Sequence, residues 1–190
     1  VYKRQDTLDV FVCHFPSRSG GAKESEPYRL YVAHILRTEV DSIMNIRSHP
    51  QAIIMGDFND YPTNQSILKI LKAEAPPVKT NDLASTTDSA NASTVTPSSL
   101  KLYHLLARKA KSKNFGSYKF RGEWGLLDHL IVSGTLLNQS NHFFTSEEKA
   151  NVCLLPFLLK DDEKYGDKDP FRTYKGMKYQ GGISDHLPIY

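Results

Sequence analysis

The sequence contains no long hydrophobic run. Within its 190 residues there is no stretch of about 18 consecutive apolar residues, so no segment is long enough to span a bilayer as a helix. The contents of 39% hydrophobic and 24% charged residues are typical of a globular protein and do not favour disorder. We therefore expect one domain without a transmembrane segment, and we expect it to be a monomer.

Net charge and cysteine are also scarce. The formal net charge is only +3, so the composition gives little support for a general affinity for nucleic acid. The two cysteines, Cys13 and Cys153, lie in apolar runs without the spacing of a metal site. Buried free thiols are the favoured interpretation, and a disulfide is the alternative. Neither residue fixes the compartment, so a secreted, periplasmic or cytoplasmic location is left open.

The beginning of the sequence indicates a truncation. No methionine stands at position 1, and a strand-like run begins at Leu8. Residues 1–5, with the sequence VYKRQ, resemble the translation of a transposase adaptor used in sequencing libraries, which predicts a non-native scar. Without Lys3 and Arg4 the net charge falls from +3 to +1. We expect residues 6–190 to form a partial domain that is truncated at its N-terminus.

Helical and strand-like segments alternate along the chain without a repeat period, which favours a layered α/β domain. The apolar patterns predict strands at residues 8–15, 51–55, 117–120, 126–133 and 151–159, and helices at 28–47, 67–71 and 100–111. Polar, turn-rich stretches predict loops at 16–27, 76–99 and 160–179. Both faces of the first strand are apolar, so we expect both to be buried. Asn64 is the expected N-cap of the helix at 67–71.

The strand at residues 51–55 runs directly into the sequence Gly56-Asp57-Phe58-Asn59-Asp60. Glycine permits a tight backbone turn, and Asp57 and Asn59 alternate to the same side of the chain. An aspartate after a strand most often serves as a turn residue or a helix cap, which is the alternative interpretation. A functional role for this motif therefore depends on whether similar side chains occur at other strand ends.

Ionisable side chains do recur at strand ends, in a fixed order. The sequences Gly56-Asp57-Phe58-Asn59, Leu127-Asp128-His129 and Ser184-Asp185-His186 resemble the signature series of the endonuclease/exonuclease/phosphatase superfamily, which includes deoxyribonuclease I and exonuclease III. Residues 12–18 are similar to the strand that ends in the family's other catalytic histidine. The resemblance implies a four-layer α/β sandwich, with two mixed β-sheets face to face and helices outside. Residues 6–190 would form the C-terminal part of that domain.

The resemblance also implies a Mg²⁺-dependent hydrolase of phosphate esters, with Mn²⁺ as the alternative metal. His186 would be the general base, because imidazole titrates nearest neutral pH, and Asp128 would orient it. Asp185, Asp57 and Asn59 are the implied metal ligands, because oxygen ligands suit a hard cation.

Contacts with the phosphate group follow from the same resemblance. Asn59 would donate a hydrogen bond to the phosphoryl oxygen, Asp57 would position the water, and His14 would stabilise the leaving oxygen. Arg18 would add a bidentate phosphate contact, although a loop arginine is often only solvated. Trp124 would form a substrate-facing rim with nearby aromatic and basic side chains, and a place in the core is the alternative.

One part of the family pattern is absent. The superfamily also uses an asparagine and a metal-binding glutamate on strands before the one that ends at His14, and only thirteen residues precede His14 here. No glutamate of the chain stands at the end of an apolar strand before that point. We therefore expect weak metal binding and no activity from these 190 residues alone.

Three classes of function remain open. A phosphodiesterase that cleaves nucleic acid is the first, by analogy with the fold. A phosphatase acting on a phospholipid or an inositol phosphate is the second, and a non-catalytic binding domain that retains the fold is the third. The densest basic group is interpreted as a solvated helix face and not as a DNA contact; it consists of Lys101, Arg108, Lys109, Lys111 and Lys113.

Overall fold

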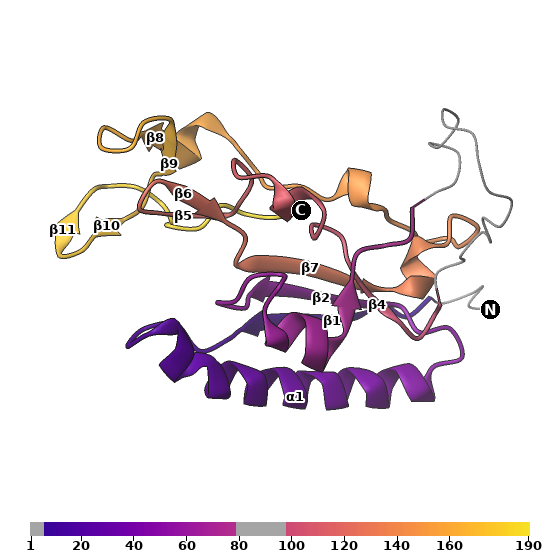
Figure 1. Ribbon diagram of the computed structural model, residues 1–190. Helices are drawn as coiled ribbons and strands as arrows, with labels where there is room; N and C mark the ends of the chain where they lie inside the picture. Colours follow the sequence, from indigo (N-terminus) through magenta and orange to yellow (C-terminus); the bar gives the residue numbers. More distant parts are fainter. Residues whose placement is uncertain (1–5, 79–97) are drawn as a thin grey trace, which may run out of the picture.

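A mixed five-stranded sheet forms the centre of the fold (Figure 1). This computed structural model describes residues 6–78 and 98–190. The strand order is β1-β2-β7-β4-β3, with the bounds Asp9–His14 for β1, Ala52–Asp57 for β2, Asp128–Ser133 for β7, Leu102–His104 for β4 and Ala73–Glu74 for β3. β1 is parallel to β2 and β3 to β4, whereas β7 is antiparallel to both of its neighbours. The predicted scar at residues 1–5 and most of the predicted loop at 76–99 lie outside the described residues.

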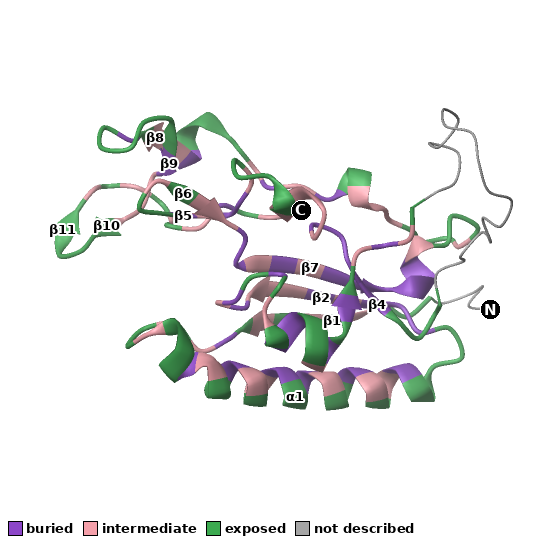
Figure 2. Cartoon of the chain, viewed as in Figure 1, coloured by how far each residue is buried: buried purple, intermediate pink, exposed green. Residues whose placement is uncertain are grey.

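Helix α1, Ala22–Ile46, connects β1 to β2 and covers one face of the sheet (Figure 1). Two parallel strands need such a crossover connection, because a tight hairpin joins only antiparallel strands. Figure 2 shows that the buried stripe of the helix faces the sheet. The stripe recurs at helical spacing and packs against Ile54 of β2; it contains Ala33, Leu36, Val40 and Met44.

The predicted start of this helix at residue 28 is wrong, since α1 begins at Ala22. Pro27 lies inside the helix and cannot donate a backbone hydrogen bond, which is why the sequence indicated a loop there. The buried Arg29 adds side-chain hydrogen bonds to this part of the helix. Its Nη2 donates to the carbonyl oxygen of Ala22 at 2.7 Å, and its Nη1 donates to Oγ of Ser25 at 2.7 Å. These bonds hold the first turns of the helix together.

The other face of the sheet is covered by a second layer of short strands (Figure 1). They form three antiparallel ribbons: β5 (Tyr118–Phe120) with β6 (Glu123–Gly125), β8 (Leu159–Asp161) with β9 (Lys168–Pro170), and β10 (Tyr174–Lys175) with β11 (Lys178–Tyr179). A second hydrophobic core lies on this side, and it includes Leu105, Leu106, Leu126, Val132, Leu158 and Leu187. The prediction of an α/β sandwich with a mixed sheet is confirmed.

The predicted helix at residues 100–111 is wrong. Leu102 and Tyr103 belong to β4, which pairs with β7, and they contribute to the two different cores. A helix would place neighbouring side chains about 100° apart, whereas a strand directs them to opposite faces, as this burial requires. Only Lys109–Lys111 is helical, as a single 3₁₀ turn. The basic group predicted as a helix face therefore lies on a strand end, turns and this 3₁₀ turn.

The predicted strand at residues 151–159 is also largely wrong. Val152 forms one isolated bridge with Ile189, and Pro156–Leu158 is a 3₁₀ helix that begins with proline. Two further 3₁₀ helices are Gly134–Leu137 and Glu147–Lys149.

The predicted helix at residues 67–71 is present as the π-helix Ser66–Leu71. Asn64 does not cap it through its side chain, because Oδ1 of Asn64 accepts from the backbone N–H of Tyr61 at 2.6 Å. None of the helices in residues 6–78 and 98–190 is both long and apolar enough to cross a membrane.

β1 is not buried on both faces, contrary to the prediction. Phe11 and Cys13 point to the core under α1, but Val12 on the opposite face is 78% exposed. β1 lies at the edge of the sheet and pairs only with β2 among the described strands. Cys13 and Cys153 are free thiols and are both half-buried, and burial raises the pKa of Cys13 to about 11.

Two histidines, His104 and His129, form a hydrogen-bonded pair in the interior. His104 Nε2 lies 2.6 Å from His129 Nδ1, and His104 Nδ1 accepts from the backbone N–H of Leu106 at 3.1 Å. His104 must therefore donate through Nε2, which leaves Nε2 of His129 to donate to the carbonyl oxygen of Asp60 at 2.9 Å. Both rings are neutral in this arrangement. Burial lowers the pKa of His104 well below its usual value and the pKa of His129 to about 4.

We expect the free energy of unfolding to fall as the pH decreases from about 6.5 to about 4. In this window the unfolded chain takes up protons on both histidines and the folded chain does not, so acid favours unfolding; above the unfolded pKa the effect vanishes. His129 alone contributes on the order of 3 kcal/mol. Urea unfolding at pH 7.5, 6 and 5 measures the change. The variant His129→Gln should show a shallower pH dependence, and equal slopes for the two proteins would contradict the assignment.

Candidate active site

Three neighbouring strands bring polar side chains to one end of the sheet. β1 ends at His14, β2 ends at Asp57, and the antiparallel β7 begins at Asp128. His14 pairs with Asp57, and Asp57 pairs with Asp128, in the register of the sheet. Residues far apart in the sequence therefore become adjacent because each stands at the matching end of its strand.

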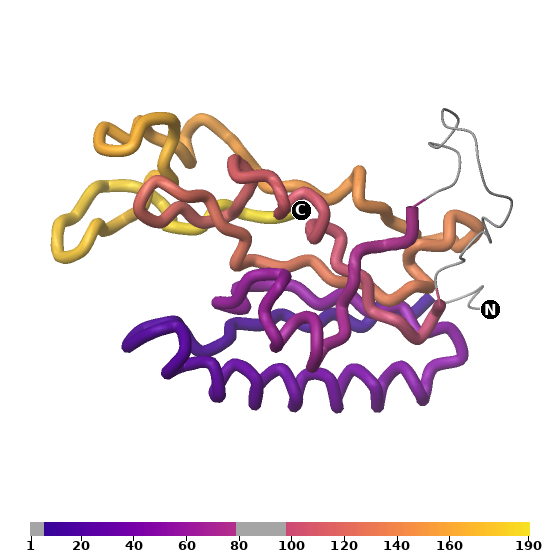
Figure 3. The backbone as a smooth tube through the Cα atoms, viewed as in Figure 1, coloured from indigo at the N-terminus to yellow at the C-terminus, as the bar shows by residue number. Residues whose placement is uncertain are grey.

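His186 reaches this end of the sheet from the segment that follows β11. Figure 3 shows this yellow segment returning beside the β5–β6 ribbon, where His186 forms an isolated bridge with Tyr118. The backbone N–H of Leu187 donates to the carbonyl oxygen of Ser117 at 2.7 Å. Nδ1 of His186 lies 2.7 Å from Oδ2 of Asp128, which also accepts from Oγ of Ser117. An ionised carboxylate can only accept, so Nδ1 carries the proton and Nε2 of His186 is free to accept one.

Burial and the neighbouring charges shift the pKa values of His186 and Asp57. Burial lowers the pKa of His186, but the hydrogen bond from its ring to Asp128 and the charges of Asp128, Asp57 and Asp185 outweigh it, so the pKa of His186 is raised above 6.5. Burial raises the pKa of Asp57, opposed by the backbone hydrogen bond from Asn59 and by the charge of His186. A base with a moderately raised pKa holds an abstracted proton well at neutral pH.

Asn59 is held in a tight turn beside Asp57. Its backbone φ is 50°, and its backbone N–H donates to Oδ1 of Asp57 at 2.8 Å. Its side-chain Nδ2 lies 3.1 Å from Oδ2 of Asp57 and 3.1 Å from the carbonyl oxygen of Phe15. Gly56 has φ 130°, and a Cβ there would lie 1.9 Å from the carbonyl oxygen of Cys13. Both amide hydrogens of Asn59 are thus engaged, and its side-chain oxygen is the group left for a ligand.

His14 and Arg18 lie at the margin of the site. The side chain of His14 is 78% exposed, and its Nε2 lies 3.6 Å from Oδ2 of Asp57. Arg18 lies in the loop that follows β1, and its guanidinium is 4.8 Å from the centre of the Tyr61 ring. His14 is therefore positioned beside the carboxylates, whereas Arg18 is stacked on an aromatic ring.

Asp185 and Trp124 are placed differently from the cluster. Asp185 is exposed and precedes His186 directly. Trp124 is half-buried, packs against the second core, and lies opposite Lys119 across the β5–β6 ribbon. It also lines a hollow of about 410 Å³ together with Tyr61 and Leu126, so it has core contacts and also borders a hollow.

A cation could be held by one group of side chains in the described parts of the chain. Ligand atoms of Asp57, Asp128 and His186 all lie within 4.8 Å of one another. Two carboxylates fit a hard divalent cation, which prefers oxygen ligands. Oδ2 of Asp128 accepts from His186 and Ser117, and both carboxylate oxygens of Asp57 accept from Asn59. No glutamate belongs to this group.

Ser117 was missed by the sequence analysis. Its hydroxyl holds Asp128, and its carbonyl oxygen anchors the segment that carries His186. A lone serine before a short strand carries no signal for such a role. Only the return of a distant segment gives this residue its function.

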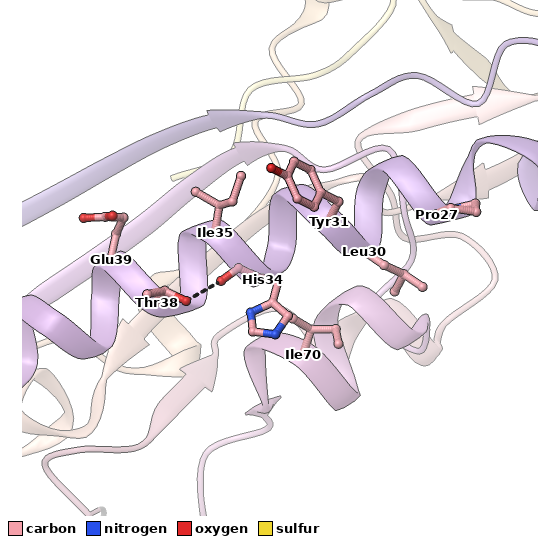
Figure 4. A pocket seen from close by; sticks show the side chains of 8 residues that line it. All are labelled: Pro27, Leu30, Tyr31, His34, Ile35, Thr38, Glu39 and Ile70. Atoms are coloured by element: carbon pink, nitrogen blue, oxygen red, sulfur yellow. Dashed lines mark hydrogen bonds between the residues drawn. The ribbon is translucent and has the colours of Figure 1, made fainter.

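One mainly apolar hollow lies elsewhere. It has a volume of about 530 Å³ and lies between the outer side of α1 and the π-helix. Figure 4 shows its eight lining side chains, mainly apolar, with Leu30, Tyr31, Ile35 and Ile70 among them. It contains none of the predicted site residues, so it is not the candidate active site.

Comparison with known proteins agrees with the ordered motifs and with this convergence. Residues 2–190 match the sequence profile of a family described as Endonuclease/Exonuclease/phosphatase family. No curated protein and no solved structure matches the chain. Proteins of this family hydrolyse phosphate esters and generally use a divalent metal ion. The match covers almost the whole chain, and the chain therefore belongs to the endonuclease/exonuclease/phosphatase family.

Proposed function

We propose that this hydrolase is a metal-dependent phosphodiesterase that cleaves nucleic acid, with His186 as its general base. The observation that carries the proposal is the 2.7 Å hydrogen bond between His186 and Asp128, located beside the carboxylate of Asp57. A domain that only binds a partner has no need for an imidazole oriented by one carboxylate and placed next to another.

The proposed chemistry uses the free nitrogen of His186. Nε2 accepts a proton from the attacking water, and the imidazolium that forms is stabilised by Asp128 and Asp57. The exposed imidazole of His14, beside Asp57, donates a hydrogen bond to a phosphoryl or leaving oxygen, where negative charge increases. Arg18 contacts the phosphate only if it leaves the Tyr61 ring.

Asp57 and Asp128 would hold the cation, together with the side-chain oxygen of Asn59 and, from outside this group, Asp185. Mg²⁺ is the proposed ion and Mn²⁺ the alternative. When bound, a divalent ion would supply charge neutralisation on the phosphate and polarisation of its P–O bonds. Few charged ligands are present in the described residues, so we expect a metal affinity in the millimolar range. Because Asp57, Asp128 and His186 nevertheless converge, we expect slow hydrolysis at millimolar metal in place of the inactivity that the sequence alone predicts.

Chelation tests this proposal. Hydrolysis of a single-stranded oligonucleotide and of bis(p-nitrophenyl) phosphate is followed with the protein in excess, in millimolar Mg²⁺ or Mn²⁺ and then in EDTA. We expect hydrolysis that EDTA abolishes and that excess metal restores. Hydrolysis that is insensitive to EDTA would contradict the metal. An oligonucleotide that is bound but not cleaved at any metal concentration would instead favour a binding domain, and faster hydrolysis of an inositol phosphate or a phospholipid would change the substrate class.

A further inference from the structure

A second hollow lies close to the candidate active site. It has a volume of about 250 Å³ and is formed by the β5–β6 ribbon and side chains of the segment at 162–175. Five cationic side chains line it, against two carboxylates; the cations are Lys119, Arg121, Lys164, Arg172 and Lys175. The hollow is therefore strongly positive.

The carboxylates of this hollow are already engaged. Asp162 forms a buried ion pair with Lys119, at 3.1 Å between Nζ and Oδ2. Asp169 contacts Arg172 at 3.4 Å and Lys175 at 3.8 Å. The five cationic side chains of the hollow therefore carry more positive charge than its two carboxylates can neutralise.

Two cations of the hollow have no ion-pair partner within the described residues, and one nitrogen of a third makes no hydrogen bond. Arg121 and Lys164 form no ion pair within the described residues, and each lies over an aromatic ring, at 5.2 Å from Phe120 and 4.9 Å from Tyr165 respectively. Nε of Arg172 is buried and has no hydrogen-bond acceptor among the described residues. A buried donor without an acceptor costs free energy, which a bound anion would remove.

The hollow is linked to the site through one aromatic ring. The guanidinium of Arg172 lies 5.8 Å from the centre of the Tyr118 ring, and the rings of Tyr118 and His186 are 4.9 Å apart. Phe120, two residues along β5, is exposed on the same side and stacks with Tyr118. Cations interleaved with exposed aromatic rings are typical of surfaces that bind single-stranded nucleic acid.

We propose that this hollow binds a second phosphate of a single-stranded nucleic-acid substrate, next to the scissile one, and that Phe120 stacks with a neighbouring base. The inference rests on the proposed phosphodiesterase function and specifies its substrate. Exposed aromatic rings beside the cations favour a nucleic acid over an inositol phosphate, which has no base to stack.

The test measures binding without turnover. Fluorescence anisotropy of a labelled single-stranded oligonucleotide is recorded in EDTA at several salt concentrations. The double variant Arg121→Ala/Lys164→Ala should reduce the slope of log K against log salt by about 0.7, the value for the one phosphate contact that the hollow makes. Phe120→Ala should weaken binding about fivefold or more.

The matched control removes the same charge from another surface. Lys111 and Lys113 are exposed, and Lys111→Ala/Lys113→Ala should leave the slope close to that of the unaltered protein. Equal slopes for the two double variants would overturn the proposal. A second pair of results would also overturn it: inositol hexakisphosphate displaces the oligonucleotide, and Phe120→Ala binds the oligonucleotide as tightly as the unaltered protein. The hollow would then be a binding site for a polyphosphate.

Failure of this inference is distinguishable from failure of the proposed function. Hydrolysis of bis(p-nitrophenyl) phosphate requires no second phosphate, so cleavage of this compound with an unchanged salt slope would reject the hollow alone. The expected slopes without hydrolysis of any diester would reject the enzyme and support the hollow.

Discussion

Replacing His186 with glutamine is expected to reduce phosphodiester hydrolysis at least about 100-fold, because general-base catalysis contributes about 10²–10⁴-fold. Glutamine keeps a polar side chain of similar length but cannot accept a proton at neutral pH. The rate is measured under single-turnover conditions at saturating Mg²⁺, with the unfolding midpoint as the check that the fold is retained. A rate within threefold of the unaltered protein would show that His186 is not the base.

Asp128→Asn provides the companion measurement. A neutral amide keeps the shape of the side chain but removes the charge that raises the pKa of His186. The rate should rise with pH as His186 loses its proton, with a half-point above 6.5 in the unaltered protein, and this half-point should move to lower pH in the variant. A purely structural role of Asp128 would lower the rate without moving the half-point.

Replacing Arg29 with leucine is expected to lower the free energy of unfolding by about 3–5 kcal/mol. Arg29 and Asp60 are 1% and 2% exposed, and Nε of Arg29 lies 2.8 Å from Oδ1 of Asp60. The substitution leaves the Asp60 carboxylate buried with Ser66 as its remaining side-chain donor, at 2.6 Å. Urea unfolding at pH 7.5 measures the change.

The double variant Arg29→Leu/Asp60→Asn separates charge from packing. Asparagine removes the unpaired charge, so we expect the double variant to recover part of the lost stability. If the double variant is less stable than Arg29→Leu, the ion pair is not the source of the effect. The hydrogen bonds from Arg29 to Ala22 and Ser25 would then dominate.

Much of the candidate site could be predicted from the sequence, because its residues stand at strand ends. Asp57, Asp128 and His186 each follow or begin an apolar or turn-defined segment, and the structure brings all three together. Such a signal is local to each segment. The family resemblance added the order in which the segments meet.

Other features depend on contacts that no local pattern contains. β4 was mistaken for part of a helix because its strand character comes from pairing with β7. The start of α1 was missed because Pro27 indicated a loop, whereas the first turns are held in the helix by contacts such as the bond from Arg29 back to Ala22. Ser117 acquires its role only when residues near 187 pair with it.

The pairing of distant segments also affects how fast the protein can fold. The backbone N–H of Ala52 donates to Oγ of Ser133, 81 positions away, and the His186–Asp128 contact joins residues separated by 58. Contacts of high sequence separation require large loops to close first, which slows folding. The turns of α1 need no such closure, so the end of the sheet that carries the candidate site is expected to become ordered after the helix has formed.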